Sequence, residues 1–222
     1  MKLFLFDLDG TLCQTYYADD NSFVKAATEV IGAPFDKNSW KGCEHLTDSA
    51  IFEHFYTSTK LVKPTDSVVK QMQSIFISIL EDKFKNDQSF FKEIPGASKF
   101  VNYINSQTNC SVGVATGGWK HIAEFKLKNI GLDTSKFDLI GSDDHHSKKD
   151  FTSSLIDSMK TKLGISAFDH IYYFGDSLYD KTCCEILGIE FIGIDYKNDN
   201  RLAESGVQRV YNHFEEIDFS TF

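Results

Sequence analysis

The sequence predicts an α/β fold: a parallel sheet covered by helices on both faces, with an all-helical segment inserted after the first strand. Short apolar runs alternate with helical patterns along most of the chain, as in doubly wound sheets. The apolar runs are continuous, which is typical of strands buried on both faces. One stretch, residues 16–87, breaks the alternation and contains helical patterns.

Five apolar runs are the candidate strands. The first spans residues 2–6 and ends abruptly in Asp-Leu-Asp-Gly-Thr, which predicts a buried strand followed by a tight turn. The later runs cover residues 111–115, 137–141, 170–175 and 189–194. Helical patterns between them cover residues 96–107, 119–130, 153–163 and 178–187, and the last three are followed by a glycine, the expected stop signal.

The inserted segment shows three further helical patterns, at residues 22–31, 48–57 and 65–84. A chain of 222 residues is short for two independent domains. We therefore expect one sheet domain made of residues 1–15 and 88–222, carrying a helical domain over residues 16–87.

Composition excludes several classes of protein. Acidic residues outnumber basic ones, 32 to 23, and we find no basic run of the kind that nucleic-acid binding needs. An anionic substrate would therefore need local positive charge, which a metal ion could supply. The five cysteines contain no Cys-x-x-Cys pair, which favours free thiols in a reducing compartment. No apolar run approaches the roughly 18 residues of a membrane span. We expect a cytoplasmic protein with no membrane or nucleic-acid partner.

The first candidate site follows the first strand. Asp7 and Asp9 stand two residues apart at its carboxyl end, where ligands bind in open parallel sheets. On an extended chain these two carboxylates would face opposite ways, but a turn at Gly10 can bring both toward one pocket. The alternative is an ordinary solvated strand-end turn, in which Asp-Gly is common.

Three more candidate sites follow in sequence. Thr116 and Gly117 end the second strand, where a hydroxyl and backbone N–H groups can hold phosphate oxygens. Asp176 and Asp180 follow the strand at residues 170–175, and such carboxylates suit Mg²⁺. A lysine in the pair at residues 148–149 could neutralise a nucleophile and a phosphate. Each pattern alone is a weak indication of a functional site, but all of them in this order along one chain are a stronger one.

Together these patterns resemble the haloacid dehalogenase-like hydrolase superfamily over nearly the whole chain. Asp7-Leu8-Asp9-Gly10-Thr11 is similar to its first motif, Thr116 to its second, Lys148 to its third and Gly175-Asp176-x-x-x-Asp180 to its fourth. The insertion falls where the family has its helical cap, and residues 46–51 resemble a cap loop of phosphoglycolate-phosphatase-like members. The third motif departs from the family's common Lys-Pro form, so Lys149 is an alternative to Lys148.

The resemblance implies a Rossmann-like sheet and a Mg²⁺-dependent phosphatase. In it, Asp7 is the nucleophile that forms an aspartyl-phosphate, and Asp9 is the general acid and base. Thr116 and Lys148 orient the phosphoryl oxygens, with Gly10 and Gly117 beside them. Asp7, the backbone carbonyl of Asp9, Asp176 and Asp180 would hold the metal ion, the last in a supporting role.

The sequence leaves rival functions open. A phosphosugar mutase would use the same nucleophile, whereas Asp9 argues against a 2-haloacid dehalogenase and the intact set of motif residues argues against a non-catalytic binding module. We expect a small phosphorylated metabolite as substrate, and a monomer or weak homodimer. Candidate substrate-contacting residues of the cap are Lys41, Glu44, His45, Thr47 and Asp48.

Overall fold

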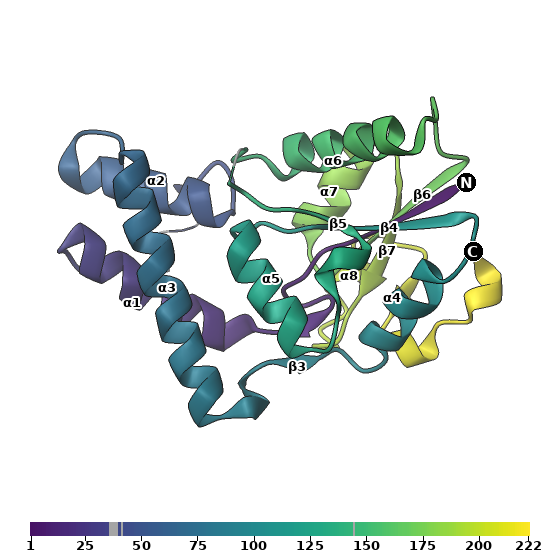
Figure 1. Ribbon diagram of the computed structural model, residues 1–222, viewed down its shortest axis with the longest axis horizontal. Helices are drawn as coiled ribbons and strands as arrows, with labels where there is room; N and C mark the ends of the chain where they lie inside the picture. The colour runs from purple at the N-terminus through teal and green to yellow at the C-terminus, as the bar shows by residue number, and fades with distance from the viewer. Residues whose placement is uncertain (36–39, 41, 144) are drawn as a thin grey trace.

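A parallel sheet with helices on both faces forms the larger part of the molecule (Figure 1). The computed structural model describes residues 1–35, 40, 42–143 and 145–222. Within these residues the main sheet has six strands in the order β5-β4-β1-β6-β7-β8, and every neighbouring pair is parallel. The strands are β1 (Lys2–Phe6), β4 (Cys110–Ala115), β5 (Asp138–Ile140), β6 (His170–Gly175), β7 (Glu190–Ile194) and β8 (Val210–Tyr211).

The helices of the sheet domain cover both faces, which confirms the predicted fold class. They are α4 (Ala97–Asn105), α5 (Lys120–Asn129), α6 (Lys148–Leu163), α7 (Leu178–Leu187) and the short α8 (Arg201–Glu204). Leu3 and Leu5 of β1 face a core built with α6 and α7, whereas Phe4 and Phe6 face one built with α4 and α5. This alternation explains why β1 is apolar at every position after Lys2. Short 3₁₀ helices cover Gln88–Phe90, Thr134–Lys136, Phe214–Glu216 and Phe219–Thr221.

Three helices lie beyond the carboxyl ends of the strands in Figure 1: α1 (Tyr16–Ile31), α2 (Asp48–Lys60) and α3 (Asp66–Asn86). They belong to the inserted segment, and α1 packs against both α3 and α2. The two connections to this segment run side by side as the antiparallel pair β2 (Cys13–Gln14) and β3 (Lys92–Glu93). The paired connections hold the helices near the carboxyl ends of the strands.

Some element boundaries differ from expectation. Helix α1 begins at Tyr16 rather than at residue 22, and α6 begins at Lys148 rather than at residue 153. Both early starts contain charged residues and too few apolar ones for a helical period, so these turns become evident only once their packing partners are known. Strands β2, β3 and β8 were not expected, because each is two residues long and has no usable pattern.

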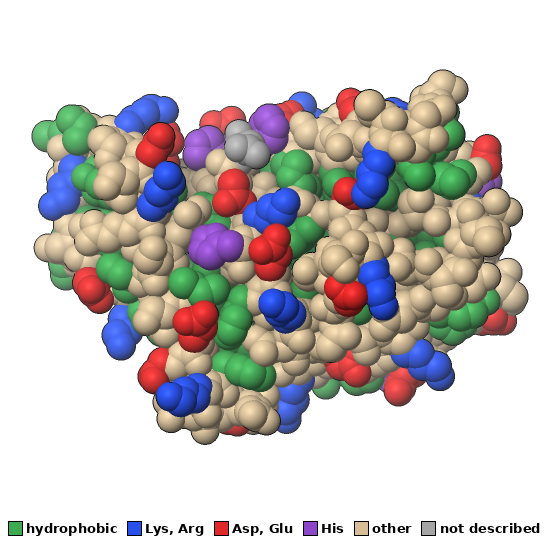
Figure 2. Space-filling model, in the orientation of Figure 1, with side chains coloured by type: hydrophobic (Ala, Val, Ile, Leu, Met, Phe, Trp, Pro, Cys, Tyr) green, Lys and Arg blue, Asp and Glu red, His purple; other side chains and the backbone are tan. Residues whose placement is uncertain are grey.

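The face of the molecule in Figure 2 carries side chains of both charges. Figure 2 shows Lys and Arg side chains scattered among Asp and Glu side chains over the face in view, without one basic patch on that face. None of the helices in the described part of the chain is long and apolar enough to cross a membrane.

Candidate active site

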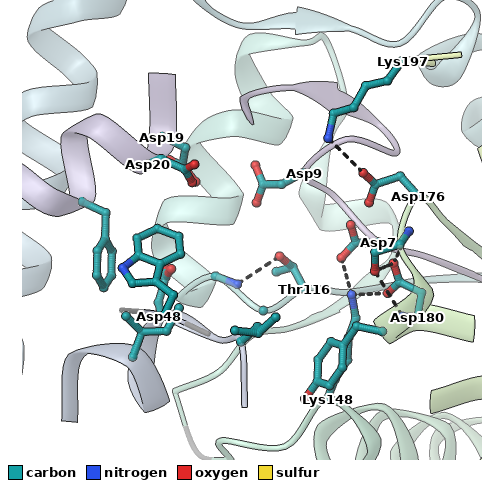
Figure 3. A pocket seen from close by; sticks show the side chains of 18 residues that line it. Asp7, Asp9, Asp19, Asp20, Asp48, Thr116, Lys148, Asp176, Asp180 and Lys197 are labelled. Atoms are coloured by element: carbon teal, nitrogen blue, oxygen red, sulfur yellow. Dashed lines mark hydrogen bonds and ion pairs between the residues drawn. The ribbon is translucent and has the colours of Figure 1, made fainter. Parts of the chain in front are cut away.

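A cavity of about 410 Å³ lies between the carboxyl ends of the strands and helices α1 and α2 (Figure 3). The neighbouring strands β4, β1 and β6 end at Ala115, Phe6 and Gly175, so the residues that follow them converge on this cavity. Its lining includes Asp7, Asp9, Thr116, Gly117, Lys148, Asp176 and Asp180. Tertiary structure thus brings together side chains that are up to 173 positions apart, from Asp7 to Asp180.

Asp7 lies at the bottom of the cavity with 5% of its surface exposed. Its backbone N–H donates to the carbonyl of Phe174 at 2.9 Å, which fixes the chain beside β6. Its carboxylate accepts from Lys148 Nζ at 2.7 Å. Burial raises the pKa of Asp7, Lys148 opposes that effect, and the nearby carboxylates of Asp180 and Asp176 add to it. The Asp7 carboxylate is therefore buried near two other carboxylates and in direct contact with one ammonium group.

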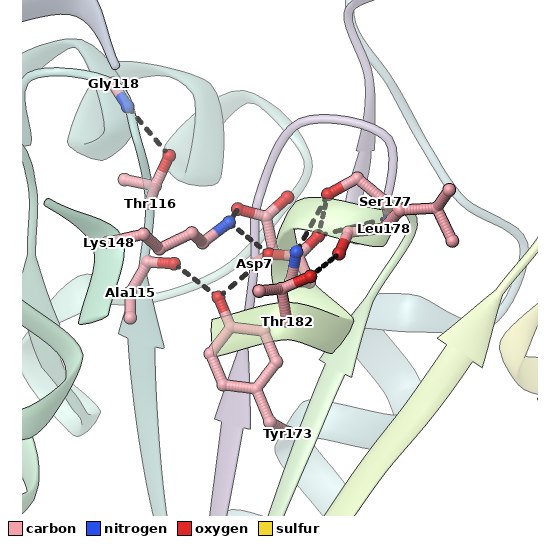
Figure 4. A network of polar contacts seen from close by, with 10 residues as sticks. Asp7, Ala115, Thr116, Gly118, Lys148, Tyr173, Ser177, Leu178 and Thr182 are labelled. Carbon is pink, nitrogen blue, oxygen red and sulfur yellow. Dashed lines mark hydrogen bonds and ion pairs between the residues drawn. The ribbon is translucent and has the colours of Figure 1, made fainter. Parts of the chain in front are cut away.

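That cation is Lys148. Its side chain is buried and forms ion pairs with Asp7 and Asp180 (Figure 3). Its Nζ atom lies 5.7 Å from the ring centre of Tyr173 (Figure 4). Burial acts to lower the pKa of Lys148, but the two carboxylates outweigh it and the pKa is raised. Lys149 has an exposed side chain that pairs with Asp150 at 2.6 Å. The structure therefore places Lys148, and not Lys149, beside Asp7.

The Asp180 side chain is held in place by contacts that the sequence did not predict. Ser177 and Asp180 form a capping box at the start of α7: the Ser177 hydroxyl accepts from Asp180 N–H, and the Asp180 carboxylate accepts from Ser177 N–H. The Tyr173 hydroxyl lies 3.4 Å from the same carboxylate and donates to the carbonyl of Ala115 at 3.1 Å. A Cβ atom on Gly175 would come within 2.7 Å of Asp180, so glycine permits this close approach.

The carboxylates of Asp7, Asp176 and Asp180 form a group that fits a metal ion. One oxygen from each lies within 4.8 Å of the others, and carboxylate oxygens are the ligands that Mg²⁺ prefers. Asp176 also lies 3.9 Å from Lys197 Nζ, a cavity-lining residue that the sequence did not single out. The Asp9 carboxylate does not belong to this group, so its predicted part in metal binding rests on its backbone carbonyl.

Thr116 follows β4 and lies at the cavity wall. Its hydroxyl is buried and accepts from Gly118 N–H at 3.1 Å, which leaves the O–H available as a donor. Gly117 also lines the cavity, and its carbonyl accepts from Asp48 N–H at 2.9 Å. Gly10 has φ +92°, a left-handed conformation that allows the tight turn after Asp9. Gly10 is not among the described residues that line the cavity.

Asp9 points toward the inserted helices (Figure 3). Its carboxylate accepts from Lys126 Nζ at 2.7 Å and from the Thr15 hydroxyl. Lys126 also donates to Asp19 on α1 at 2.6 Å. Neither Lys126 nor Asp19 was among the predicted site residues, because no local pattern links residues that lie 107 positions apart.

The inserted helices dock on the loop after β4. Asp48, at the start of α2, accepts from Trp119 N–H at 3.2 Å, and burial raises its pKa. The fully buried Trp119 ring stacks against Phe23 of α1 at 5.9 Å and donates to the Ser49 hydroxyl at 2.8 Å. Trp119 is therefore an anchor between the two parts of the molecule.

Of the candidate cap residues, Asp48 lines the cavity. Thr47 is buried, caps α2 and donates to the carbonyl of His146, so it holds the helix in place. His45 lies 3.5 Å from the hydroxyl of Tyr179, and Glu44 is exposed. Lys41 lies outside the described residues.

Comparison with protein-family models identifies one family. A family model described as haloacid dehalogenase-like hydrolase matches residues 4–194. The structure resembles a hydrolase from Pseudomonas syringae, with TM-score 0.66 and 21% identity over 98% of this chain and 99% of that chain. It also resembles a predicted phosphoglycolate phosphatase from Haemophilus somnus 129PT, with TM-score 0.68 and 19% identity over 100% and 98%.

An archaeal β-phosphoglucomutase from Pyrococcus sp. strain ST 04 has TM-score 0.58 and 15% identity, over 100% of this chain and 96% of that chain. At these identities the likeness to solved structures establishes a shared fold. A search of curated proteins finds no match.

Proposed function

Because this chain belongs to the haloacid dehalogenase-like hydrolases, we propose that it hydrolyses a small-molecule phosphate monoester through an aspartyl-phosphate on Asp7. The observation that carries the proposal is the placement of Asp7. Its carboxylate is buried at the bottom of a cavity, 2.7 Å from the buried ammonium of Lys148. A carboxylate in this setting can attack phosphorus, and the neighbouring cation can neutralise the phosphoryl oxygens.

The residues divide the reaction between them. An oxygen of Asp7 forms a bond to phosphorus while the bond from phosphorus to the leaving oxygen breaks, and Asp9 gives that oxygen a proton. Asp9 then takes a proton from a water molecule whose oxygen attacks phosphorus. The bond from Asp7 to phosphorus breaks, which releases phosphate and restores the carboxylate. Thr116 and Lys148 hold the phosphoryl oxygens during both steps.

We propose Mg²⁺ as the cofactor, held by Asp7, Asp176 and the backbone carbonyl of Asp9, with Asp180 in support. The group of three carboxylates supports this proposal. When bound, Mg²⁺ would neutralise charge on the phosphoryl group. We further propose that residues 16–87 act as a cap domain, since α1 and α2 supply Asp19 and Asp48 to the cavity wall. The substrate would then be a small phosphorylated metabolite that fits about 410 Å³.

The test is Asp7→Asn, which keeps the shape of the side chain but removes the nucleophile. We expect no phosphate release from a panel of metabolite phosphates and an aryl phosphate with Mg²⁺. Mass analysis of quenched enzyme should detect the phosphorylated chain in the wild type only. Asp157→Asn, an exposed aspartate on α6, is the matched control and should keep full activity.

Activity of Asp7→Asn within tenfold of wild type would refute the nucleophile assignment. Faster transfer of the phosphoryl group to a sugar than to water would replace the phosphatase proposal with a mutase.

A further inference from the structure

Lys126 is a buried lysine that connects the first motif to the inserted helices. It lies on α5, and 1% of its surface is exposed. Its ammonium donates to Asp9 Oδ1 at 2.7 Å and to Asp19 Oδ2 of α1 at 2.6 Å. Lysines are almost never fully buried unless they are paired, so the two carboxylates account for its position. They also raise the pKa of Lys126 although burial acts to lower it.

The position of Asp9 matters because of the direction of phosphoryl transfer. The attacking and leaving oxygens lie roughly in line on opposite sides of phosphorus. With Asp7 attacking from the floor of the cavity, the leaving oxygen faces the wall formed by α1 and α2. Figure 3 shows the Asp9 carboxylate turned toward that wall, away from the group formed by Asp7, Asp176 and Asp180. An acid that protonates the leaving oxygen has to lie on this side.

We propose that Lys126 is a positioning residue that holds the Asp9 carboxylate on the leaving-group side of the cavity. This inference rests on the proposed function, because it takes Asp9 as the general acid. Lys126 reaches Asp9 from α5 and is itself held by Asp19 of α1. The hydroxyl of Thr15, at the start of α1, donates to the same Asp9 oxygen, so the placement of Asp9 is coupled to the position of α1. The ion pair thereby ties the geometry of proton transfer to the position of the inserted helices.

A purely structural bridge between α5 and α1 is the alternative. Asp19 Oδ1 is buried and, in the described part of the chain, has no hydrogen-bond partner. Leaving a buried polar atom without a partner is unfavourable, so this oxygen adds nothing to the stability of a bridge. The two interpretations differ in one respect: positioning acts through Asp9, whereas a structural bridge does not.

The experiment is a double-mutant cycle of Lys126→Met and Asp9→Asn, each assayed with an alkyl phosphate and an aryl phosphate. An aryl leaving group needs little protonation, so a misplaced acid should matter less for it. General acid–base catalysis is typically worth about 10²–10⁴-fold. We therefore expect Lys126→Met to lower kcat with the alkyl phosphate by about 10²-fold or more, and with the aryl phosphate by about tenfold or less.

In the Asp9→Asn background, Lys126→Met should change kcat by less than about threefold with either substrate, because residues that act as a unit are not additive. Lys126→Arg keeps the charge and the donors, and we expect partial recovery. Lys128→Met, an exposed lysine on the same helix, is the matched control and should behave as wild type. Thermal melting of each variant shows whether it is folded, and Lys126→Gln replaces the Met variant in the cycle if that variant does not fold.

Equal losses with both substrates, or the same loss in the Asp9→Asn background, would overturn the positioning role. Wild-type activity of Lys126→Met would also overturn it. These outcomes are distinct from failure of the proposed function, which would appear as retained activity in Asp7→Asn. If Asp7→Asn is inactive and Asp9→Asn is selective for the leaving group while the cycle is additive, only the role of Lys126 is refuted.

Discussion

Replacing Lys148 by Met should destabilise the protein and abolish its activity. Lys148 is the cation shared by Asp7 and Asp180, and the exposed fractions of the three side chains are 6%, 7% and 1%. Removing one member of a buried ion pair leaves an uncompensated charge and costs about 3–5 kcal/mol. Asp7 would then favour its protonated form, which cannot attack phosphorus.

The loss of stability should depend on pH. The folded-state pKa of Asp7 lies above its ordinary value of 3.8, so its contribution to stability is present below that value and is lost as pH rises through the folded pKa. Burial raises this pKa, and Lys148 opposes that effect through its charge and its hydrogen bond, so removing the lysine should raise the pKa further. The difference in unfolding free energy between wild type and Lys148→Met should therefore be largest at pH 7 and shrink toward pH 4.

Urea unfolding in metal-free buffer at pH 4, 5.5 and 7 measures this difference, and phosphate release measures activity. Lys149→Met is the matched control, because Lys149 is adjacent in sequence but exposed and pairs with its neighbour Asp150. It should be close to wild type in both assays. If Lys148→Met and Lys149→Met are indistinguishable in stability at pH 7 and in activity, the structural argument for the buried pair is wrong.

Three further results are expected. Chelation of metal ions should abolish activity, and added Mg²⁺ should restore it. Ca²⁺ should restore activity poorly, because Ca²⁺ favours more ligands and looser geometry. Full activity in excess chelator would exclude a role for the metal ion. Burial raises the pKa of Asp19 to about 6, so this group should lower the unfolding free energy of wild type by up to about 3 kcal/mol between pH 4 and pH 6. Urea unfolding measures this change, and the same dependence of unfolding free energy on pH in Asp19→Asn would contradict it. Trp119→Ala should cost about 3–5 kcal/mol in the same assay, and a loss under about 1 kcal/mol would show that the ring is not an anchor.

The sequence by itself determined the layered architecture. Continuous apolar runs are what strands buried on both faces require, so the pattern of apolar residues alone locates β1, β4, β5, β6 and β7. The positions of the candidate site residues could be predicted from the same strands. Parallel strands present their carboxyl ends at one edge of the sheet, and residues such as Asp7, Thr116 and Asp176 therefore had to lie near one another.

Tertiary structure decided which side chains meet. The family resemblance favours Lys148 over Lys149, but only the path of α6 shows that one is buried beside Asp7 and the other is exposed. Likewise, nothing local to Lys126 indicates that it reaches both Asp9 and Asp19. Local periodicity records whether a residue faces a core, because that depends on its neighbours in sequence. The partner of a buried charge depends on how distant elements pack, and that information is spread over the whole chain.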